Sequence, residues 1–499
     1  MLILALCISA ETWAQTNVVD GKDISVTDPA VMLTGTLPVM TINTENNAPV
    51  VDKENKINAF LDVTLPDDYE TYNGFEAKSL TGEMLTIKGR GNASWLLDKK
   101  PYKLKFESKT AVLGMPKHKH FALIPWPTGY AGWMASVCGM EMARLTGQPW
   151  APHMEPVELV LNGSYEGLYF VVESMKIDKN RLNIYEQEEN ITDPELIKGG
   201  WLVEIDNYND EFQITIPETE DMLLRVTHKS PEVVSDVQRQ WLIDAFTAMN
   251  DAIYSGDVTG NGWAELIDAT SVARYFIVRE LLCDTDGYNG SFYLHKDFGD
   301  DCKWNFGPMW DLSFEPKKDW VMNDHPDYAA VHWIGEIFKT DAFKNALVEQ
   351  WAAFLPKYDE VIKSAERIAA MCSEADKANF KRWPQYEDDT TSNKLRYFKV
   401  YLDANRDWMD AQIALMSGVE DNVAVSEVPL FKVNGRGIML AFIAENVNIS
   451  VAGADGRVVR NIQSPAGRYI DLSDLNAGLY IVSATAPGTS GTVAKIIVR

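Results

Sequence analysis

Alternating apolar and polar positions predict a run of strands in the first part of the chain. Residues 37–65 alternate on both sides of an asparagine-rich turn, and MLTIKGRGNASW and PYKLKFES continue the pattern. In PYKLKF, the period of two places the apolar side chains on one face and Lys103 and Lys105 on the other. EPVELVLNGSYEGLYFVVESM predicts a hairpin that turns at Asn162 and Gly163.

Helical spacing dominates the second half of the chain. Residues 130–146, 231–255 and 264–283 predict helices, the last of them opening near Asp268, and residues 340–416 are mostly helical in pattern. The segments SFYLHKD and KWNFGPMW predict a strand pair around the turn FGDD. A strand-rich half followed by a helix-rich half favours an α+β fold with two lobes.

The pattern changes again near residue 417. Residues 417–428 form a polar linker, and residues 429–499 contain only β-type segments separated by turn residues. This spacing predicts a small antiparallel β-sandwich at the C-terminal end.

Composition narrows the class of protein. A length of 499 residues favours two or three domains, and a net charge of −26 disfavours binding to nucleic acid or to an anionic membrane. Residues 1–15 contain a short apolar stretch before small residues, which predicts a signal peptide and export. No later stretch approaches the ~20 apolar residues of a transmembrane helix. Apart from Cys7, the chain has four cysteines: Cys138, Cys283, Cys302 and Cys372. The sequence leaves two alternatives open, a disulfide such as Cys283–Cys302 or four buried free thiols.

Two clusters contain candidate chemistry, and the first spans residues 87–106. Glycines flank Arg90, and several lysines follow it, which is unusual in so acidic a chain. Such a loop and strand suit an anion such as phosphate, although a solvated basic hairpin explains the same pattern. His118 and His120, two positions apart with no evident third metal ligand, are expected in a surface loop.

The second cluster is ELLCDTDGYNGSFYLHKD with the following FGPMWDLSFEP. Asp284, Asp286 and Asn289 follow a helix, and Asp311 follows a hairpin that can fold it back beside Asp286. Two carboxylates and an amide there would suit a hard divalent cation, and phosphoryl transfer by kinases needs such a set. An ordinary loop between a helix and a strand explains the same residues.

Together these segments resemble the spore-coat protein H family of kinase-like proteins. The pieces occur in the family's order over about residues 37–410: LPVMTINTEN, IKGRGNASW with KKPYKLKF, GSYEGLYFVVESMKIDKNRLNI, GGWLVEID, ARYFIVRELLCDTDGYNGSFYLHKD and KWNFGPMWDLSF. The resemblance implies an atypical protein-kinase-like fold that binds ATP with Mg²⁺ or Mn²⁺. Some members of the family phosphorylate secreted proteins.

The resemblance also implies roles for individual residues. Asp286 matches the catalytic-loop aspartate, and Asp311 matches the metal-binding aspartate, with Asn289 as a further metal ligand. Many relatives have asparagine where this chain has Asp284, and the spacing of ordinary kinases would fit Asp284 as the base, so that assignment stays open. The expected nucleotide-binding residues are Arg90, Asn92, Trp95, Glu173, and either Lys103 or Lys105. Whether Glu173 or Glu141 orients the lysine is also open.

The C-terminal segment resembles the sorting domain of the type IX secretion system. The matching pieces are GRVV, IDLSDLNAGLYIV and AKIIVR. This resemblance implies recognition by the secretion machinery and passage to the cell surface or beyond.

The sequence therefore predicts a secreted or surface-displayed kinase-like protein that transfers phosphate to a Ser or Thr hydroxyl of another secreted or surface protein. Two alternatives remain: a non-catalytic surface module with the same fold, and a site that transfers a nucleotidyl group.

Overall fold

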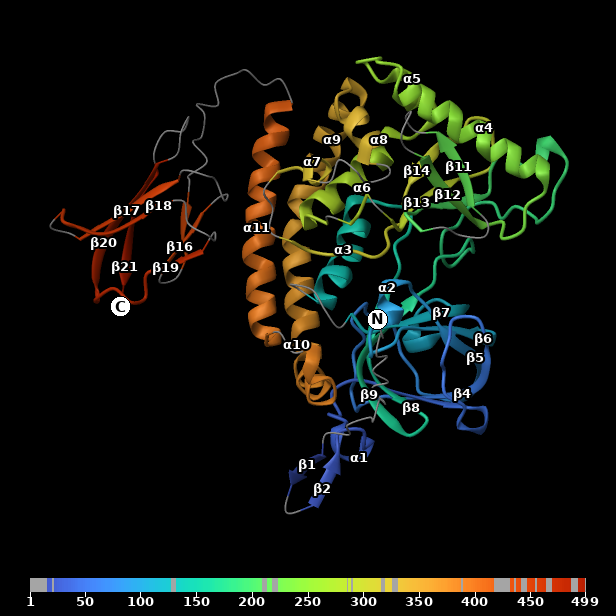
Figure 1. Ribbon diagram of the computed structural model, residues 1–499, viewed down its shortest axis with the longest axis horizontal. Coiled ribbons are helices and arrows are strands. Elements are labelled where there is room, and N and C mark those ends of the chain that lie inside the picture. The colour runs from blue at the N-terminus through green and yellow to red at the C-terminus, as the bar shows by residue number, and fades with distance from the viewer. Residues whose placement is uncertain are drawn as a thin grey trace, which may run out of the picture. The chain divides into compact units, whose positions relative to one another are not determined.

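A computed structural model describes most of the chain (Figure 1). Its described residues are 16–19, 22–126, 132–208, 213–217, 223–284, 286–288, 290–315, 319–324, 331–386, 389–416, 431–434, 437–440, 447–453, 456–463, 469–485 and 492–498. Within these ranges no helix has the length and apolar character needed to cross a membrane. The predicted signal peptide, the predicted linker over residues 417–428 and Asn289 lie outside the described residues.

The chain divides into two compact units. The first, called the barrel unit, comprises residues 1–140, 150–183 and 360–396. The second, called the mixed unit, comprises residues 141–149, 184–359 and 397–499. Three helices contribute to both units: α3 (Trp133–Thr146), α10 (Tyr358–Arg382) and α11 (Thr391–Met416).

The barrel unit contains a closed barrel of strands in the order β3-β4-β5-β6-β7-β9-β8 (Figure 1). All neighbours pair antiparallel except β3 and β8, which run parallel and close the barrel. The strands are β3 (Val39–Thr44), β4 (Ile57–Thr64), β5 (Leu80–Gly89), β6 (Tyr102–Thr110), β7 (His118–Ile124), β8 (Met154–Leu161) and β9 (Ser164–Glu173).

Alternation along the strands fills the barrel core. Leu104 and Phe106 of β6 are buried in one hydrophobic cluster with Leu85 of β5 and Phe121 of β7. The hairpin between β8 and β9 turns at Asn162 and Gly163 with φ of 51° and 79°. Positive φ at both positions is what a two-residue hairpin turn requires, so the predicted asparagine–glycine turn is present.

The remaining elements of the barrel unit are short. They are the hairpin strands β1 (Thr16–Val19) and β2 (Lys22–Ser25) and the helices α1 (Pro29–Met32) and α2 (Ala93–Leu96).

The mixed unit contains an antiparallel sheet with the strand order β11-β12-β10-β13-β14. Its strands are β10 (Trp201–Ile205), β11 (Gln213–Pro217), β12 (Leu223–Ser230), β13 (Phe292–Lys296) and β14 (Trp304–Phe306). Its helices are α4 (Asp236–Ile253), α5 (Asn261–Leu266), α6 (Ala269–Leu282), α7 (Val321–Asp324), α8 (Val331–Phe338) and α9 (Asp341–Phe354).

Capping residues decide where the helices begin. Helix α4 begins after Ser235, whose hydroxyl accepts from the backbone of Gln238 in a capping box, rather than at residue 231 as expected. The predicted helix over 264–283 is two helices, because α5 ends at Leu266 and Asp268 caps α6.

Every element in the described part of residues 431–498 is a β-strand, as predicted. A three-stranded sheet, β15-β16-β19, and a four-stranded sheet, β18-β17-β20-β21, share one hydrophobic core. The strands are β15 (Phe431–Asn434), β16 (Gly437–Leu440), β17 (Asn448–Gly453), β18 (Val458–Gln463), β19 (Tyr469–Asp471), β20 (Gly478–Thr485) and β21 (Thr492–Val498).

The α+β class is confirmed, the structure adds two findings that the sequence did not decide, and one expectation needs correction. The strand-rich half closes into a barrel, which was not expected. No disulfide joins the four cysteines in the described part of the chain, so the Cys283–Cys302 bridge is absent. His118 does not lie in a surface loop, because it begins strand β7 and is buried.

Candidate functional site

Helix α6 positions the loop that contains Asp284 and Asp286. The Asp268 side chain accepts from the backbone of Ser271 at 3.0 Å and fixes where the helix begins. Nearly every residue of α6 is buried, so the helix has little freedom to shift or rotate. It ends at Cys283, whose φ of 51° turns the chain into the loop.

Arg279 of α6 joins this loop to the segment that contains Asp311. Its side chain is fully buried and forms an ion pair with the carboxylate of Asp284. The same guanidinium donates to the carbonyl oxygens of Trp310 at 2.9 Å and of Asp311 at 3.3 Å. A buried guanidinium is stable only with such partners, so these contacts hold the two segments together.

Tyr275, one helical turn earlier, extends the connection. Arg279 Nε donates to the Tyr275 hydroxyl at 3.1 Å, and that hydroxyl donates to the carbonyl of Gly287 at 3.2 Å. A Cβ at Gly287 would lie 2.6 Å from Cδ of Arg279, so only glycine fits there without displacing the arginine. We call Tyr275, Arg279 and Asp284 the Arg279 clamp.

Asp284 and Asp286 have different surroundings. Both carboxylate oxygens of buried Asp284 are engaged, one by Arg279 and the other by the Ser313 hydroxyl at 2.6 Å. Burial raises the pKa of Asp284, and the nearby charge of Arg279 opposes that rise. Asp286, in contrast, is exposed to solvent. The clamp therefore uses Asp284 internally and leaves the Asp286 carboxylate at the surface.

Asp311 lies at the surface although its neighbours are buried. Met309, Trp310, Leu312 and Phe314 are each at most 9% exposed, whereas Asp311 is exposed. The backbone of Asp311 has φ of 51°, a left-handed conformation that aspartate tolerates better than most residues. The buried neighbours thus fix the backbone while the carboxylate points outward.

A further aspartate near this loop was not among the predicted site residues. Asp206 follows strand β10, and a Cβ at Gly290 would lie 2.9 Å from its Oδ1. Burial, followed by the charge of Glu204, raises the pKa of Asp206 to about 6. The segment GGWLVEID contained the signal, because it ends with an aspartate directly after an apolar strand.

The residues of the first cluster lie together in the barrel unit. The Trp95 ring covers Gly89, where a Cβ would come within 2.5 Å of the ring. Lys100 donates to the carbonyl of Trp95 at 2.7 Å, and Lys53 donates to the Asn92 side chain at 3.3 Å. Arg90 is half-buried, and its backbone N–H donates to the carbonyl of Pro101 at 3.2 Å. The loop is therefore a packed structure and not a freely solvated turn.

Lys103 and Lys105 are exposed on the outer face of the barrel, as the alternation predicted. Lys88 of β5 pairs directly with Lys103, and His120 of β7 pairs with Lys105. Burial, followed by nearby cations, lowers the pKa of His120 to about 3. Like charges in directly opposed positions destabilise a sheet, and a bound anion would relieve that repulsion.

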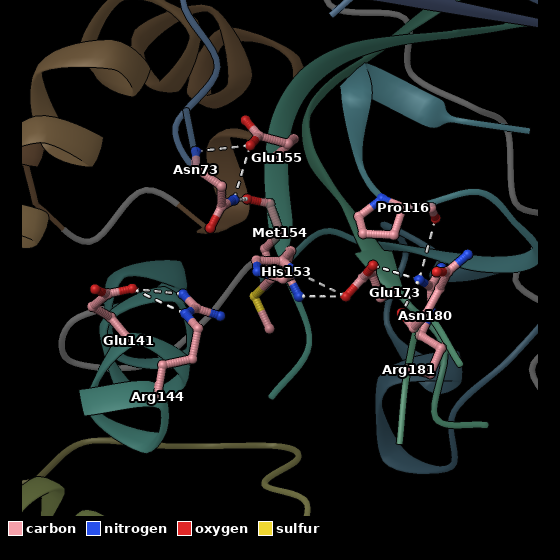
Figure 2. A network of polar contacts seen from close by, with 10 residues as sticks. All are labelled: Asn73, Pro116, Glu141, Arg144, His153, Met154, Glu155, Glu173, Asn180 and Arg181. Atoms are coloured by element: carbon pink, nitrogen blue, oxygen red, sulfur yellow. Dashed lines mark hydrogen bonds and ion pairs between the residues drawn. The ribbon is translucent and has the colours of Figure 1, made fainter. Parts of the chain in front are cut away.

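Glu173 lies at the end of β9 with its carboxylate already engaged (Figure 2). It accepts from Arg181 at 2.5 Å, from the backbone of His153 at 3.0 Å, and contacts the His153 ring at 2.9 Å. All of these atoms are buried or nearly so, which makes a structural ion pair. Glu141, the alternative, pairs with Arg144 of the same helix at 2.7 Å.

Comparison with known protein families decides which family the chain belongs to. The model of the CotH kinase protein family matches residues 87–409. The chain belongs to this family. No curated protein matches the chain significantly.

Every predicted site residue, from Arg90 to Asp311, lies inside the CotH match. Strands β3 and β4 and most of β5 precede it, so part of the barrel wall lies outside the matched segment.

A second family model, the secretion system C-terminal sorting domain, matches residues 433–499. This match covers the β-sandwich and confirms the resemblance seen in the sequence. The CotH protein is therefore exported by the type IX route to the cell surface or outside the cell.

Proposed function

We propose that the CotH domain binds ATP with Mg²⁺ or Mn²⁺ and transfers its terminal phosphate to a Ser or Thr hydroxyl of another secreted or surface protein. The observation that carries this proposal is the Arg279 clamp. One buried guanidinium holds both the loop that begins at Asp284 and the backbone of Trp310 and Asp311. Each of these two segments has one exposed carboxylate, Asp286 in the first and Asp311 in the second.

The donor set fits a hard divalent cation. Asp286 and Asp311 are exposed carboxylates, whereas both oxygens of buried Asp284 already accept from Arg279 and Ser313. Within the described residues no group of three or more His, Cys, Asp or Glu gathers as a metal cage. Magnesium bound with a nucleotide typically takes only one or two carboxylates, because phosphate oxygens and water complete its coordination. Asp311 would hold the cation, with Asn289 as a second ligand.

In this proposal Asp286 is the base. The exposure of Asp286 and the internal contacts of Asp284 support this choice between the two aspartates. Asp286 accepts the proton of the acceptor hydroxyl while that oxygen bonds to the terminal phosphorus and the bond to the ADP oxygen breaks. The metal neutralises charge on the phosphates when bound.

Lys103 or Lys105 would contact the phosphates from the outer face of the barrel, beside the loop formed by Arg90, Asn92 and Trp95. Exposed lysines in opposed positions of the sheet support a role in anion binding. Glu173 would act indirectly, since its carboxylate is held by Arg181 and His153. The kinase-like arrangement of two lobes is part of this proposal.

A transfer assay tests the proposal against both alternatives. The full chain is incubated with Mn²⁺, a generic protein acceptor, and ATP labelled at either the terminal or the first phosphate. Label from the terminal phosphate alone, lost in Asp286→Asn, is the expected result. Label from the first phosphate would instead indicate nucleotidyl transfer. Nucleotide binding without any transfer would indicate a non-catalytic module.

A further inference from the structure

A pocket of about 550 Å³ opens on the outer surface of the barrel. Its floor contains Phe60 of β4 and Met84 of β5, which pair directly across the two strands. These apolar side chains are 53% and 52% exposed, although the inward neighbours of both are buried in the core. Two large apolar side chains at the base of a pocket favour contact with an apolar group of a ligand.

Three lysines also line this pocket. Lys56, Lys105 and Lys119 line the pocket, and within the described part of the chain none of them forms an ion pair or side-chain hydrogen bond. The pocket also contains Glu107 and Glu45, and the Glu45 carboxylate accepts from Asn58 at 3.3 Å.

The charge of the pocket contrasts with the charge of the protein. The chain has 72 acidic and 46 basic side chains and a net charge of −26, so the protein as a whole repels anions. Three lysines against two glutamates in the pocket, with Lys88 and Lys103 on neighbouring outward positions, give this surface a local excess of positive charge.

The closed barrel limits how a partner can bind there. Strands β4, β5 and β6 each pair on both sides, so no strand edge is available to add another strand. An occupant must therefore be held through the outward side chains.

We propose that this surface, the barrel pocket, binds an acidic segment of a partner protein. One apolar side chain of the segment packs on Phe60 and Met84, and flanking carboxylates contact Lys56 and Lys119, which take no part in the proposed nucleotide site. The barrel pocket then serves as a docking site for the acceptor protein. That docking role rests on the proposed function, whereas the binding itself does not.

The apolar floor of the pocket lies outside the segment that the CotH family model covers, which begins at residue 87. Lys56, Phe60 and Met84 all precede that position. The pocket therefore adds a binding surface to the matched domain and is a candidate for acceptor selection.

Fluorescence anisotropy with the full chain tests the binding. The probe is a labelled nine-residue peptide with a central phenylalanine and glutamates on both sides. Binding should weaken at least tenfold in Lys56→Glu and in Phe60→Asp, and should weaken as salt concentration rises. Lys78→Glu is the matched control, because Lys78 is exposed in the same unit and outside the pocket. A peptide with lysines in place of the glutamates should not bind.

Three results would overturn the proposal. The first is unchanged affinity in both pocket variants while their thermal unfolding matches wild type. The second is displacement of the peptide by metal-free ATP with the same sensitivity to the variants, since the occupant would then be a nucleotide. The third is a dimer that the variants dissociate, because the pocket would then hold a second copy.

The docking role is measured separately from the chemistry. Asp286→Asn should keep full peptide affinity, so loss of transfer leaves the binding result intact. For an acceptor that carries the acidic segment, Lys56→Glu should raise KM about tenfold with little change in kcat. An unchanged KM would refute docking even if transfer is confirmed.

Discussion

Asp284 and Asp286 are two residues apart and have opposite surroundings. The first is completely buried and bonded to Arg279 and Ser313, and the second is exposed. Removing one member of a buried ion pair leaves the other charge uncompensated, which typically costs 3–5 kcal/mol. An exposed carboxylate has much less influence on stability than a buried one.

These surroundings predict opposite phenotypes for two matched variants. Asp284→Asn should lower the free energy of unfolding by about 3 kcal/mol, because it leaves Arg279 without its counter-charge. Asp286→Asn should leave that free energy unchanged and reduce phosphate transfer at least about 100-fold, as expected for loss of a general base. Urea unfolding and the transfer assay measure the two effects. If Asp286→Asn remained active while a folded Asp284→Asn protein were inactive, Asp284 would be the base.

His118 predicts a pH dependence of stability. Burial, followed by the charge of Arg181, lowers the pKa of His118 to about 4 from an unfolded value near 6.5. Between these values the unfolded chain binds the proton more readily, so stability falls as pH decreases from 6.5 to 4 and is unaffected above that window.

Replacing the histidine should reduce this dependence. His118→Asn, which keeps a side-chain acceptor, should lose less stability between pH 7 and pH 4.5 than wild type, by on the order of 1 kcal/mol after allowance for solvent screening. Urea unfolding at the two pH values checks this. Equal losses in both proteins would show that His118 is protonated in the folded state.

At the scale of elements, helix α6 connects two loops through one side chain. Arg279 forms a buried charge pair with Asp284, which affects folding, and it also holds the carbonyls of Trp310 and Asp311, which positions the site. The two effects should therefore be separable by removing both buried charges together.

A charge-balanced double variant provides that separation. Arg279→Met combined with Asp284→Leu removes both buried charges, and such replacements are often neutral or stabilising. The free energy of unfolding should stay within about 2 kcal/mol of wild type, while metal-dependent nucleotide binding should weaken at least tenfold. Hydrogen exchange at residues 310–315 should also become faster, since two backbone contacts are lost. Wild-type binding and exchange in the folded double variant would show that the clamp only fills the core.

Local chemistry explains which elements the sequence could predict. The period of two in PYKLKF placed Lys103 and Lys105 outward because the barrel core accepts only the apolar partners. The asparagine–glycine turn and the cap at Asp268 are determined within a few residues, so they too could be read directly.

Long-range pairing explains what the sequence could not predict. The barrel closes through parallel pairing of β3 with β8, which joins residues more than 100 positions apart, such as Val39 and Glu158. The ion pair between Asp284 and Arg279 forms only because of the way helix α6 ends. The contacts of Arg279 with the carbonyls of Trp310 and Asp311 require the hairpin between them to return to the helix, which local sequence does not determine. The sequence could place Asp284, Asp286 and Asp311 near one another, but it left their individual roles open.

At the scale of the whole molecule, one chain combines a CotH domain with a type IX sorting sandwich. The protein is exported to the cell surface or outside the cell, and an acceptor of the proposed transfer would have to lie there too. The barrel pocket lies in the barrel unit and the Arg279 clamp in the mixed unit. Substitutions of Lys56 or Phe60 are therefore expected to affect docking, and substitutions in the clamp are expected to affect phosphate transfer.

Metal-dependent nucleotide binding is the central claim of this account. Asp311 is exposed, so Asp311→Asn removes the charge that would hold the cation, and asparagine also tolerates the left-handed backbone found there. Stability of the variant should therefore remain within about 1 kcal/mol of wild type.

Calorimetric titration of the full chain with ATP, in Mn²⁺ and in EDTA, tests the claim most directly. Wild type should bind ATP at least tenfold more tightly with Mn²⁺, and Asp311→Asn should bind equally weakly in both buffers. ATP affinity that is independent of metal in wild type, or metal-dependent binding that survives in Asp311→Asn, would contradict it.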